Sequence, residues 1–112
     1  MLSHKDKELL LIHAALQVQY QKPEQAITLL DGLLEFEPEH QEAQQTLAVA
    51  CFHSGQYERS AELCQKLIEK GAPNQTGLWF CLSQVRWKQK KVEEARHAHR
   101  RYLQSINSET NE

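Results

Sequence analysis

The sequence predicts an all-α chain built from three similar helix-turn-helix units. Apolar residues recur at intervals of three and four along most of the 112 residues, and no run alternates with a period of two. A second spacing of 34 or 35 positions relates two sets of small residues: Ala14, Ala48 and Ser83, and Ala26, Ser60 and Ala95. Helical periodicity and a long repeat together predict six helices arranged as three pairs.

A helix-turn-helix unit that repeats about every 34 residues is typical of tetratricopeptide (TPR) repeats. Three such units fill most of the chain. We predict a single domain over residues 1–106, with repeats at about 7–40, 41–74 and 76–106, and a polar tail over 107–112. Repeats of this kind stack into a short superhelical array, and the concave groove of the array binds another polypeptide.

The first three helices follow from their start and stop signals. Ser3 and Asp6 form a capping box, which predicts a first helix to about Tyr20. Pro23 suits the first turn of a second helix, over about 24–37, because its missing N–H would be unpaired there. Pro38 marks the next break, and a third helix over about 41–53 precedes the turn at Gly55.

The last three helices are delimited in the same way. The fourth, over about 57–70, ends at Gly71, a residue that readily adopts the left-handed conformation of a helix C-terminus. Pro73 and Asn74 start the third unit, whose helices are predicted over about 75–89 and 92–105. The repeat pattern usually has Gly at its turn, but Gln21 and Lys90 stand at two of these positions.

The composition gives no indication of a nucleic-acid or membrane partner. The 13 basic and 15 acidic residues leave a formal net charge of −2, so the chain has no global positive field. The basic residues between Lys88 and Arg101 are interrupted by Glu93 and Glu94, and we interpret them as a solvated helix face. No segment approaches the roughly 18 apolar residues of a membrane span, and no signal peptide is recognised. Three cysteines, an odd number, favour free thiols in a reducing cytoplasm.

The cysteines and histidines do not form a predicted metal site. None of the cysteines has CxxC spacing, and His97 and His99 are two apart, which points them away from each other on a helix. Cys51 and Cys64 fall on packing positions of the repeat and are interpreted as small buried residues. A Cys/His nucleophile lacks an orienting third group, and no Gly-rich phosphate loop is present. We predict no cofactor, no metal and no enzyme activity.

The first helix of each repeat faces the concave side of a TPR array, which predicts the residues of the groove. They are Leu11, Ala15, Val18, Gln45, Val49, Phe52, His53, Phe80, Gln84 and Trp87. TPR domains that bind acidic C-termini carry Lys, Arg and Asn at such positions, whereas only Lys88 is nearby here. The predicted ligand is therefore an apolar or amphipathic segment, such as a helix laid in the groove. The alternative for Phe52 and Trp87 is that each is an internal packing residue.

The first helix is apolar around most of its circumference, although an end helix of a solenoid is expected to be polar on its outer side. The last helix obeys that rule, because Arg96, Arg100 and Arg101 lie outside its apolar stripe. We predict that the N-terminal end is covered by the partner or by a second copy of the chain, a homodimer being the alternative when the chain is alone. The residues of this second contact or self-association surface are Leu9, Ile12 and Leu16.

Three segments resemble the small YscY/SctY-type TPR chaperones of bacterial type III secretion. They are LLLIHAALQVQ from Leu9 to Gln19, AITLLDGLLEFEPEH from Ala26 to His40, and LWFCLSQVRWKQKKVEEARHAHRRYL from Leu78 to Leu103. The resemblance covers about residues 7 to 105. The first and last segments carry it, whereas the middle helix pair, about 41 to 70, is generic for TPR repeats.

The resemblance implies a cytoplasmic, non-catalytic chaperone that stabilises one small secreted protein of the YscX/SctX type. The pair would dock on the cytosolic domain of the inner-membrane export gate, of the YscV/SctV type, and enable the secretion of early substrates. Two alternatives stay open: another chaperone class of the same system, for translocators or needle subunits, and a general TPR scaffold that binds peptides. No residue of the family's binding surface is carried over, so the predicted sites rest on repeat geometry.

Overall fold

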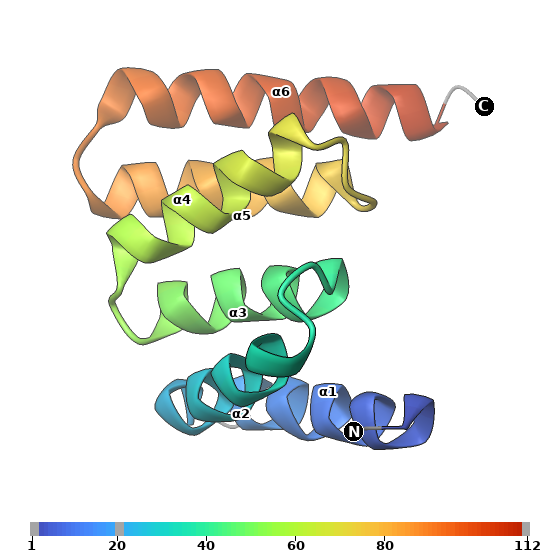
Figure 1. The fold of residues 1–112 in the computed structure, drawn as a ribbon. Helices are drawn as coiled ribbons and strands as arrows, with labels where there is room; N and C mark the ends of the chain where they lie inside the picture. Colours follow the sequence, from blue (N-terminus) through green and yellow to red (C-terminus); the bar gives the residue numbers. More distant parts are fainter. Residues whose placement is uncertain (1–2, 20–21, 111–112) are drawn as a thin grey trace.

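The computed structural model describes residues 3–19 and 22–110, with the exception of the side chains of residues 7, 13, 15–19, 109 and 110. All regular structure in these ranges is helical, as predicted (Figure 1). The six helices are α1 (His4–Gln19), α2 (Pro23–Phe36), α3 (Gln41–His53), α4 (Tyr57–Glu69), α5 (Gln75–Lys88) and α6 (Val92–Thr110). They form three consecutive antiparallel pairs, which confirms the TPR-like all-α fold.

Side chains that cap the helices explain where α1, α3 and α5 begin. The amide of Asp6 donates to Ser3 Oγ and the amide of Ser3 donates to Asp6 Oδ2, both over 3.1 Å, which is the predicted capping box. His40 Nδ1 accepts from an amide in the first turn of α3, and Asn74 Oδ1 accepts from one in the first turn of α5. Each cap satisfies a backbone N–H that has no partner within its own helix.

The turns inside the second and third repeats have the same geometry, although Gly55 forms one and Lys90 the other. Gly55 has φ of 83° and Lys90 has φ of 64°, so both lie in the left-handed region. The residue after each donates its amide to the helix before it, Gln56 to Cys51 O over 2.8 Å and Lys91 to Arg86 O over 2.9 Å. Lys90 therefore carries a steric cost that glycine avoids. Gln21, the other unusual turn residue, lies outside the described residues.

The last helix is longer than the sequence indicated. The predicted end lay near residue 105, but α6 continues to Thr110, so residues 107–110 of the predicted polar tail are helical. The stretch contains no Gly or Pro to stop the helix. Ser105 and Ile106 are half-buried, so the added turn starts from residues that pack against the domain.

The contacts between helices bend the array. Each helix packs on the next one in sequence, and α3 also approaches both α1 and α5. Within the described residues, α2 does not approach α4 in this way, and α4 does not approach α6. Because the first helices of the repeats lie closer together than the second helices, the side formed by α1, α3 and α5 is the concave one. This arrangement agrees with the face assigned from the repeat register.

The small residues of the register lie where the two helices of each repeat cross. All six are buried, with exposed fractions between 0% and 5%: Ala14, Ala26, Ala48, Ser60, Ser83 and Ala95. At the centre of the array Ser60 Oγ donates to the carbonyl oxygen of Ala48 over 2.7 Å. The hydroxyl of Ser60 thus replaces the methyl group of the usual alanine without leaving a buried polar group unpaired.

Two clusters of buried apolar residues form the core. The first joins α1, α2 and α3 around Leu30, Leu33 and Leu47. The second joins α3, α4, α5 and α6 around Leu67, Leu82 and Val85. The core therefore runs along the array, and each repeat is held by its neighbours, as expected for a solenoid.

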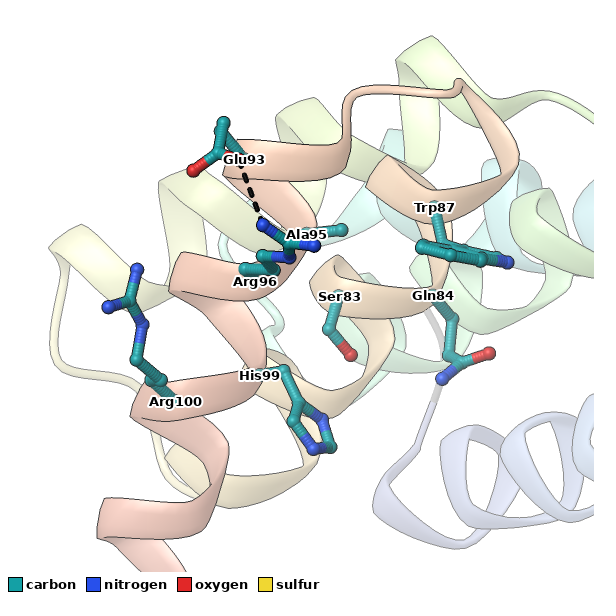
Figure 2. Close-up of a pocket in the computed structure, with 8 residues that line it drawn as sticks. All are labelled: Ser83, Gln84, Trp87, Glu93, Ala95, Arg96, His99 and Arg100. Carbon is teal, nitrogen blue, oxygen red and sulfur yellow. Dashed lines mark hydrogen bonds and ion pairs between the residues drawn. The ribbon is translucent and has the colours of Figure 1, made fainter.

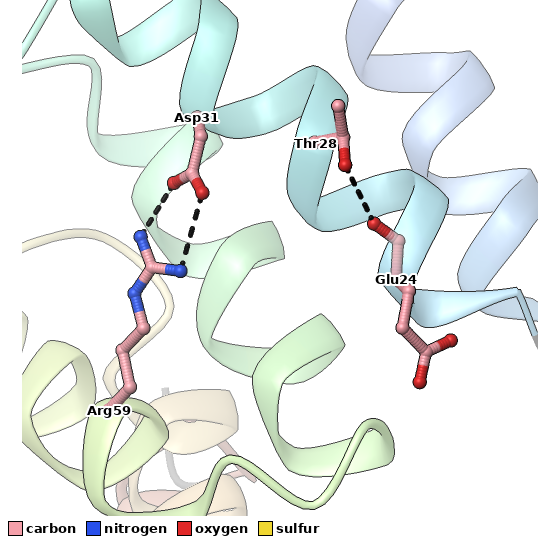
Figure 3. A network of polar contacts seen from close by, with 4 residues as sticks. All are labelled: Glu24, Thr28, Asp31 and Arg59. Atoms are coloured by element: carbon pink, nitrogen blue, oxygen red, sulfur yellow. Dashed lines mark hydrogen bonds and ion pairs between the residues drawn. The ribbon is translucent and has the colours of Figure 1, made fainter.

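Polar contacts tie one repeat to the next near the surface. Arg59 of α4 forms a two-pronged ion pair with Asp31 of α2, with its shorter contact at 2.6 Å (Figure 3). The Asp31 carboxylate raises the pKa of the Arg59 guanidinium, mainly through this hydrogen bond. Both side chains are about two-fifths exposed, so the pair contributes about 1 kcal/mol or less. Lys70 and Glu39 form a similar pair at 2.8 Å.

We predict that Lys90→Gly raises the free energy of unfolding by about 1 kcal/mol, because glycine adopts a positive φ at no steric cost. The matched control is Lys88→Gly at the last residue of α5, which is expected to lower stability by up to about 1 kcal/mol. Urea denaturation followed by circular dichroism measures both. An unchanged or lowered midpoint for Lys90→Gly would contradict the strained turn.

Candidate partner-binding site

Three apolar side chains predicted for the groove are exposed on the concave side. Val49 of α3 is 38% exposed, and Phe80 and Trp87 of α5 are 44% and 61% exposed. His53, at the end of α3, is also exposed. Apolar side chains of this size on one face of a small domain are typical of a protein-binding surface. Trp87 is thus not the internal packing residue that the alternative interpretation required.

The neighbouring aromatic residues hold two of the groove positions in place. Phe80 packs against Tyr102 of α6, with ring centroids 5.1 Å apart. Phe52 is half-buried, contacts His53 and Tyr57, and packs on the second core cluster. Part of the Phe52 ring therefore packs in the core, and only the rest can contact a ligand. Phe80, by contrast, has nearly half of its surface exposed.

One predicted groove residue is buried in the core, and another makes a hydrogen bond within the domain. Leu11 was predicted to be exposed, but it is only 8% exposed and belongs to the first core cluster. Its helix lies at the end of the array and packs on α2 and α3 through this residue. Gln45 is half-buried, and its side-chain amide donates to the carbonyl oxygen of Pro73 over 2.5 Å. That bond ties α3 to the loop before α5.

The apolar surface of α1 is described in part. Leu9 and Ile12 are 64% and 58% exposed, so the first helix does present apolar side chains to solvent. Ala15, Leu16 and Val18, the other residues predicted on this helix, lie outside the described side chains. The expected contrast with α6 holds only in part, because Val92 and Leu103 of α6 are also exposed.

A cavity of about 660 Å³ opens between α5 and α6, next to Trp87. Figure 2 shows Ser83, Gln84 and Trp87 of α5 on one side of it. Its other side is formed by residues of α6: Glu93, Ala95, Arg96, His99 and Arg100. The groove positions Gln84 and Trp87 are thus shared between the concave face and this cavity, which continues the surface toward the C-terminal end of the array.

The residues that α6 contributes to the cavity were not predicted as site residues. Arg96 forms an ion pair with Glu93 at 3.2 Å, whereas Arg100 forms none with any residue that the structure describes. The sequence did contain a signal for them. Arg96 and His99 occupy the register of Ala61 and Cys64, which are buried in the previous repeat. A change from buried apolar residues to exposed polar ones at equivalent positions indicates that these positions face a different neighbour.

The thiols lie in the core rather than in a reactive site. All three cysteines are free and buried. Burial raises the pKa of the Cys51 thiol, and a hydrogen bond to Cys81 together with burial raises that of Cys64. No cluster of three His, Cys, Asp or Glu side chains suited to a metal ion is found among the described residues. In the same part of the chain no helix is long and apolar enough to cross a membrane.

Comparison with known proteins identifies the family. The chain is 37% identical over 103 residues to the chaperone protein YscY of Yersinia enterocolitica and to that of Yersinia pestis. The matched region covers 92% of this chain and 90% of each relative. The chain belongs to the YscY family of chaperones. The resemblance noted in its sequence segments is thereby confirmed.

A second comparison agrees on the fold. The family model described as "Anaphase-promoting complex, cyclosome, subunit 3", which is of TPR type, matches residues 19–102. This range spans α2 to α5 and the first part of α6, and it includes only the last residue of α1. As a member of a chaperone family with a TPR-type fold, this YscY relative is a binding protein and not an enzyme.

We predict that the native thiols of Cys51 and Cys64 react with iodoacetamide at least about 100-fold more slowly than in denaturant. Because the folded-state pKa of each is raised, the thiolate fraction stays low as the pH rises from about 7 to 9, the range in which a free thiol with a pKa near 8.5 ionises. Mass spectrometry of timed alkylation at both pH values measures the rates. A native rate that rises with pH as in the denatured chain would contradict the buried placement.

Proposed function

We propose that this chain is a type III secretion chaperone that binds and stabilises a small secreted protein of the YscX/SctX type in its concave groove. Together the two proteins dock on the cytosolic domain of the YscV/SctV-type export gate and enable the secretion of early substrates. The chain acts in the bacterial cytoplasm, peripherally at the inner-membrane secretion apparatus. Membership of the YscY family supports the chaperone role.

The observation that carries the proposal is the exposure of Val49, Phe80 and Trp87 on the concave side. These side chains lie on α3 and α5, two adjacent helices that contact each other, so a ligand can touch both helices at once. Full burial of a side chain of this size stabilises a complex by about 1.5 to 3 kcal/mol. A partner with an apolar stripe gains this energy, and an amphipathic helix presents such a stripe on one face.

The exposed residues of α1 support a second contact. Residues that stand at the positions of Leu9 and Ile12 in later repeats face the preceding repeat. Ala43 and Leu78 are the equivalents of Leu9, and Cys81, whose Sγ lies 3.8 Å from Ser60 Oγ, is the equivalent of Ile12 in the third repeat. Ala43 and Leu78 are buried in the two core clusters. Leu9 and Ile12 therefore occupy a junction that no preceding repeat covers in the described chain, and we assign its cover to the partner or to a second copy.

We predict that Phe80→Glu or Trp87→Glu weakens binding of the secreted partner at least about tenfold, because a carboxylate would have to be desolvated in an apolar contact. Phe36→Glu is the matched control, since Phe36 is 68% exposed at the end of α2, on a helix of the outer side. Isothermal titration calorimetry gives the affinities, and circular dichroism verifies folding. Equal affinities for the Phe80 and Phe36 variants would rule out the groove as the binding surface.

Leu9→Asp tests the surface on α1. We expect this substitution to shift the isolated chain toward monomer, because it places a charge at an apolar junction, and to leave helicity unchanged since Leu9 is exposed. Analytical ultracentrifugation at several concentrations measures the shift. The assignment fails if the wild-type chain is already monomeric and Leu9→Asp changes neither its state nor its affinity for the partner.

A further inference from the structure

The cavity between α5 and α6 lies at the position where another helix of the array would pack. In the second repeat, Ser60 Oγ lies 3.8 Å from Cys81 Sγ of α5, and Cys64 belongs to the same core cluster as Cys81. These contacts seat α5 against α4. The residues 35 positions after Ser60 and Cys64 are Ala95 and His99, and both line the cavity.

The other side of the cavity follows the same register. Ala48 of α3 and Ala61 of α4 share a core cluster with the residues of α5 that face them. Their equivalents one repeat later are Ser83 and Arg96, which also line the cavity. Four cavity residues thus stand at positions that, one repeat earlier, pack against the next helix, α5. Within the described chain no helix follows α6 to occupy the place.

We propose that this position seats an amphipathic helix of the secreted partner that carries carboxylates along one flank. The proposal rests on the proposed function only for the identity of the partner. Trp87 provides the exposed surface for the apolar face of the helix, and the nearly buried Ser83 and Ala95 line the floor of the cavity. The site extends the groove, since Trp87 and Gln84 belong to both.

The charge of the cavity indicates the acidic flank. Arg96 and His99 replace Ala61 and Cys64 of the previous repeat. Arg100 adds a second guanidinium, and this one forms no ion pair within the described part of the chain. Glu93 is the one acidic residue of the lining, and it is already paired with Arg96. An incoming carboxylate would therefore meet an excess of donors, and bidentate pairing with arginine would fix the position of its helix.

The same charges argue against a second copy of the chain as the occupant. In a head-to-tail array, α1 of one copy would enter the cavity of the next copy. It would pack there in the way that α3 packs on the first repeat within one chain. Leu9 and Ile12 would then face Arg96 and His99 without offering them a hydrogen-bond acceptor, and burying these polar side chains against apolar ones is costly. Such stacking is also heterologous and does not close, so charges at this end oppose the growth of fibres.

Photo-crosslinking in the purified complex with the YscX/SctX-type partner tests the occupant. p-Benzoylphenylalanine is placed at three exposed histidines: His99 in the cavity, His53 in the groove and His97, two residues from His99 on the same helix. His97 packs on Trp79 at 6.0 Å, away from the cavity, and is the matched control. We expect His99 and His53 to crosslink to the partner, His99 to a segment with acidic residues, and His97 to give no product.

The outcomes separate the two proposals. Crosslinks from His53 without any from His99 would overturn the cavity assignment and leave the proposed function standing. The absence of crosslinks from either position, or the failure of a complex to form, would overturn both. A crosslink from His99 to a second copy of this chain would replace the partner by self-association, which also contradicts the inference.

Charge reversal tests the acidic flank independently. We expect Arg96→Glu with Arg100→Glu to weaken partner binding at least about tenfold at low salt, and the difference to shrink as salt screens the pairs. Lys22→Glu with Lys66→Glu changes the net charge equally at two exposed sites outside the cavity and is expected to retain the affinity. Equal losses of affinity for the two double variants would show that the effect depends only on net charge, and this would contradict the proposal.

Discussion

The close approach of the two helices within each repeat is the constraint on which the rest of the structure depends. Ala48 and Ser60 illustrate it, because the hydroxyl of Ser60 reaches the carbonyl of Ala48 across the helix crossing at 2.7 Å. A larger side chain at either position would separate the helices. The same constraint recurs one repeat earlier and one repeat later, where only alanine or serine occupies the buried positions. Close packing at these crossings sets the spacing of every other residue.

This spacing determines which side chains stay exposed. Since the helices cross at small residues, the large apolar residues fill the space between successive repeats, and the first helices come together on the concave side. Val49, Phe80 and Trp87 are then left on a surface that the described part of the chain does not cover. Among the described residues, each end of the array also presents an exposed face at the position of a junction between repeats. This face is apolar at α1 and rich in arginine at the cavity beside α6.

The sequence predicted the six helices closely, because periodicity, proline breaks and caps are local signals. It was less able to distinguish exposed from buried residues along one helix face. Leu11 was assigned to the groove by register, but at the end of the array it packs into the core. Gln45 is engaged by the carbonyl of Pro73, a contact between residues 28 apart that no local pattern encodes. The continuation of α6 to Thr110 was missed because a polar stretch without Gly or Pro is compatible both with the end of a helix and with an irregular tail.

Native mass spectrometry of the chain co-expressed with a YscX/SctX-type secreted protein tests most directly whether the uncovered surfaces exist to bind that partner. We expect a one-to-one complex, and self-association of this chain when it is expressed alone, because the exposed apolar residues then have only one another to contact. A stable monomer that forms no complex with the secreted protein would contradict this conclusion.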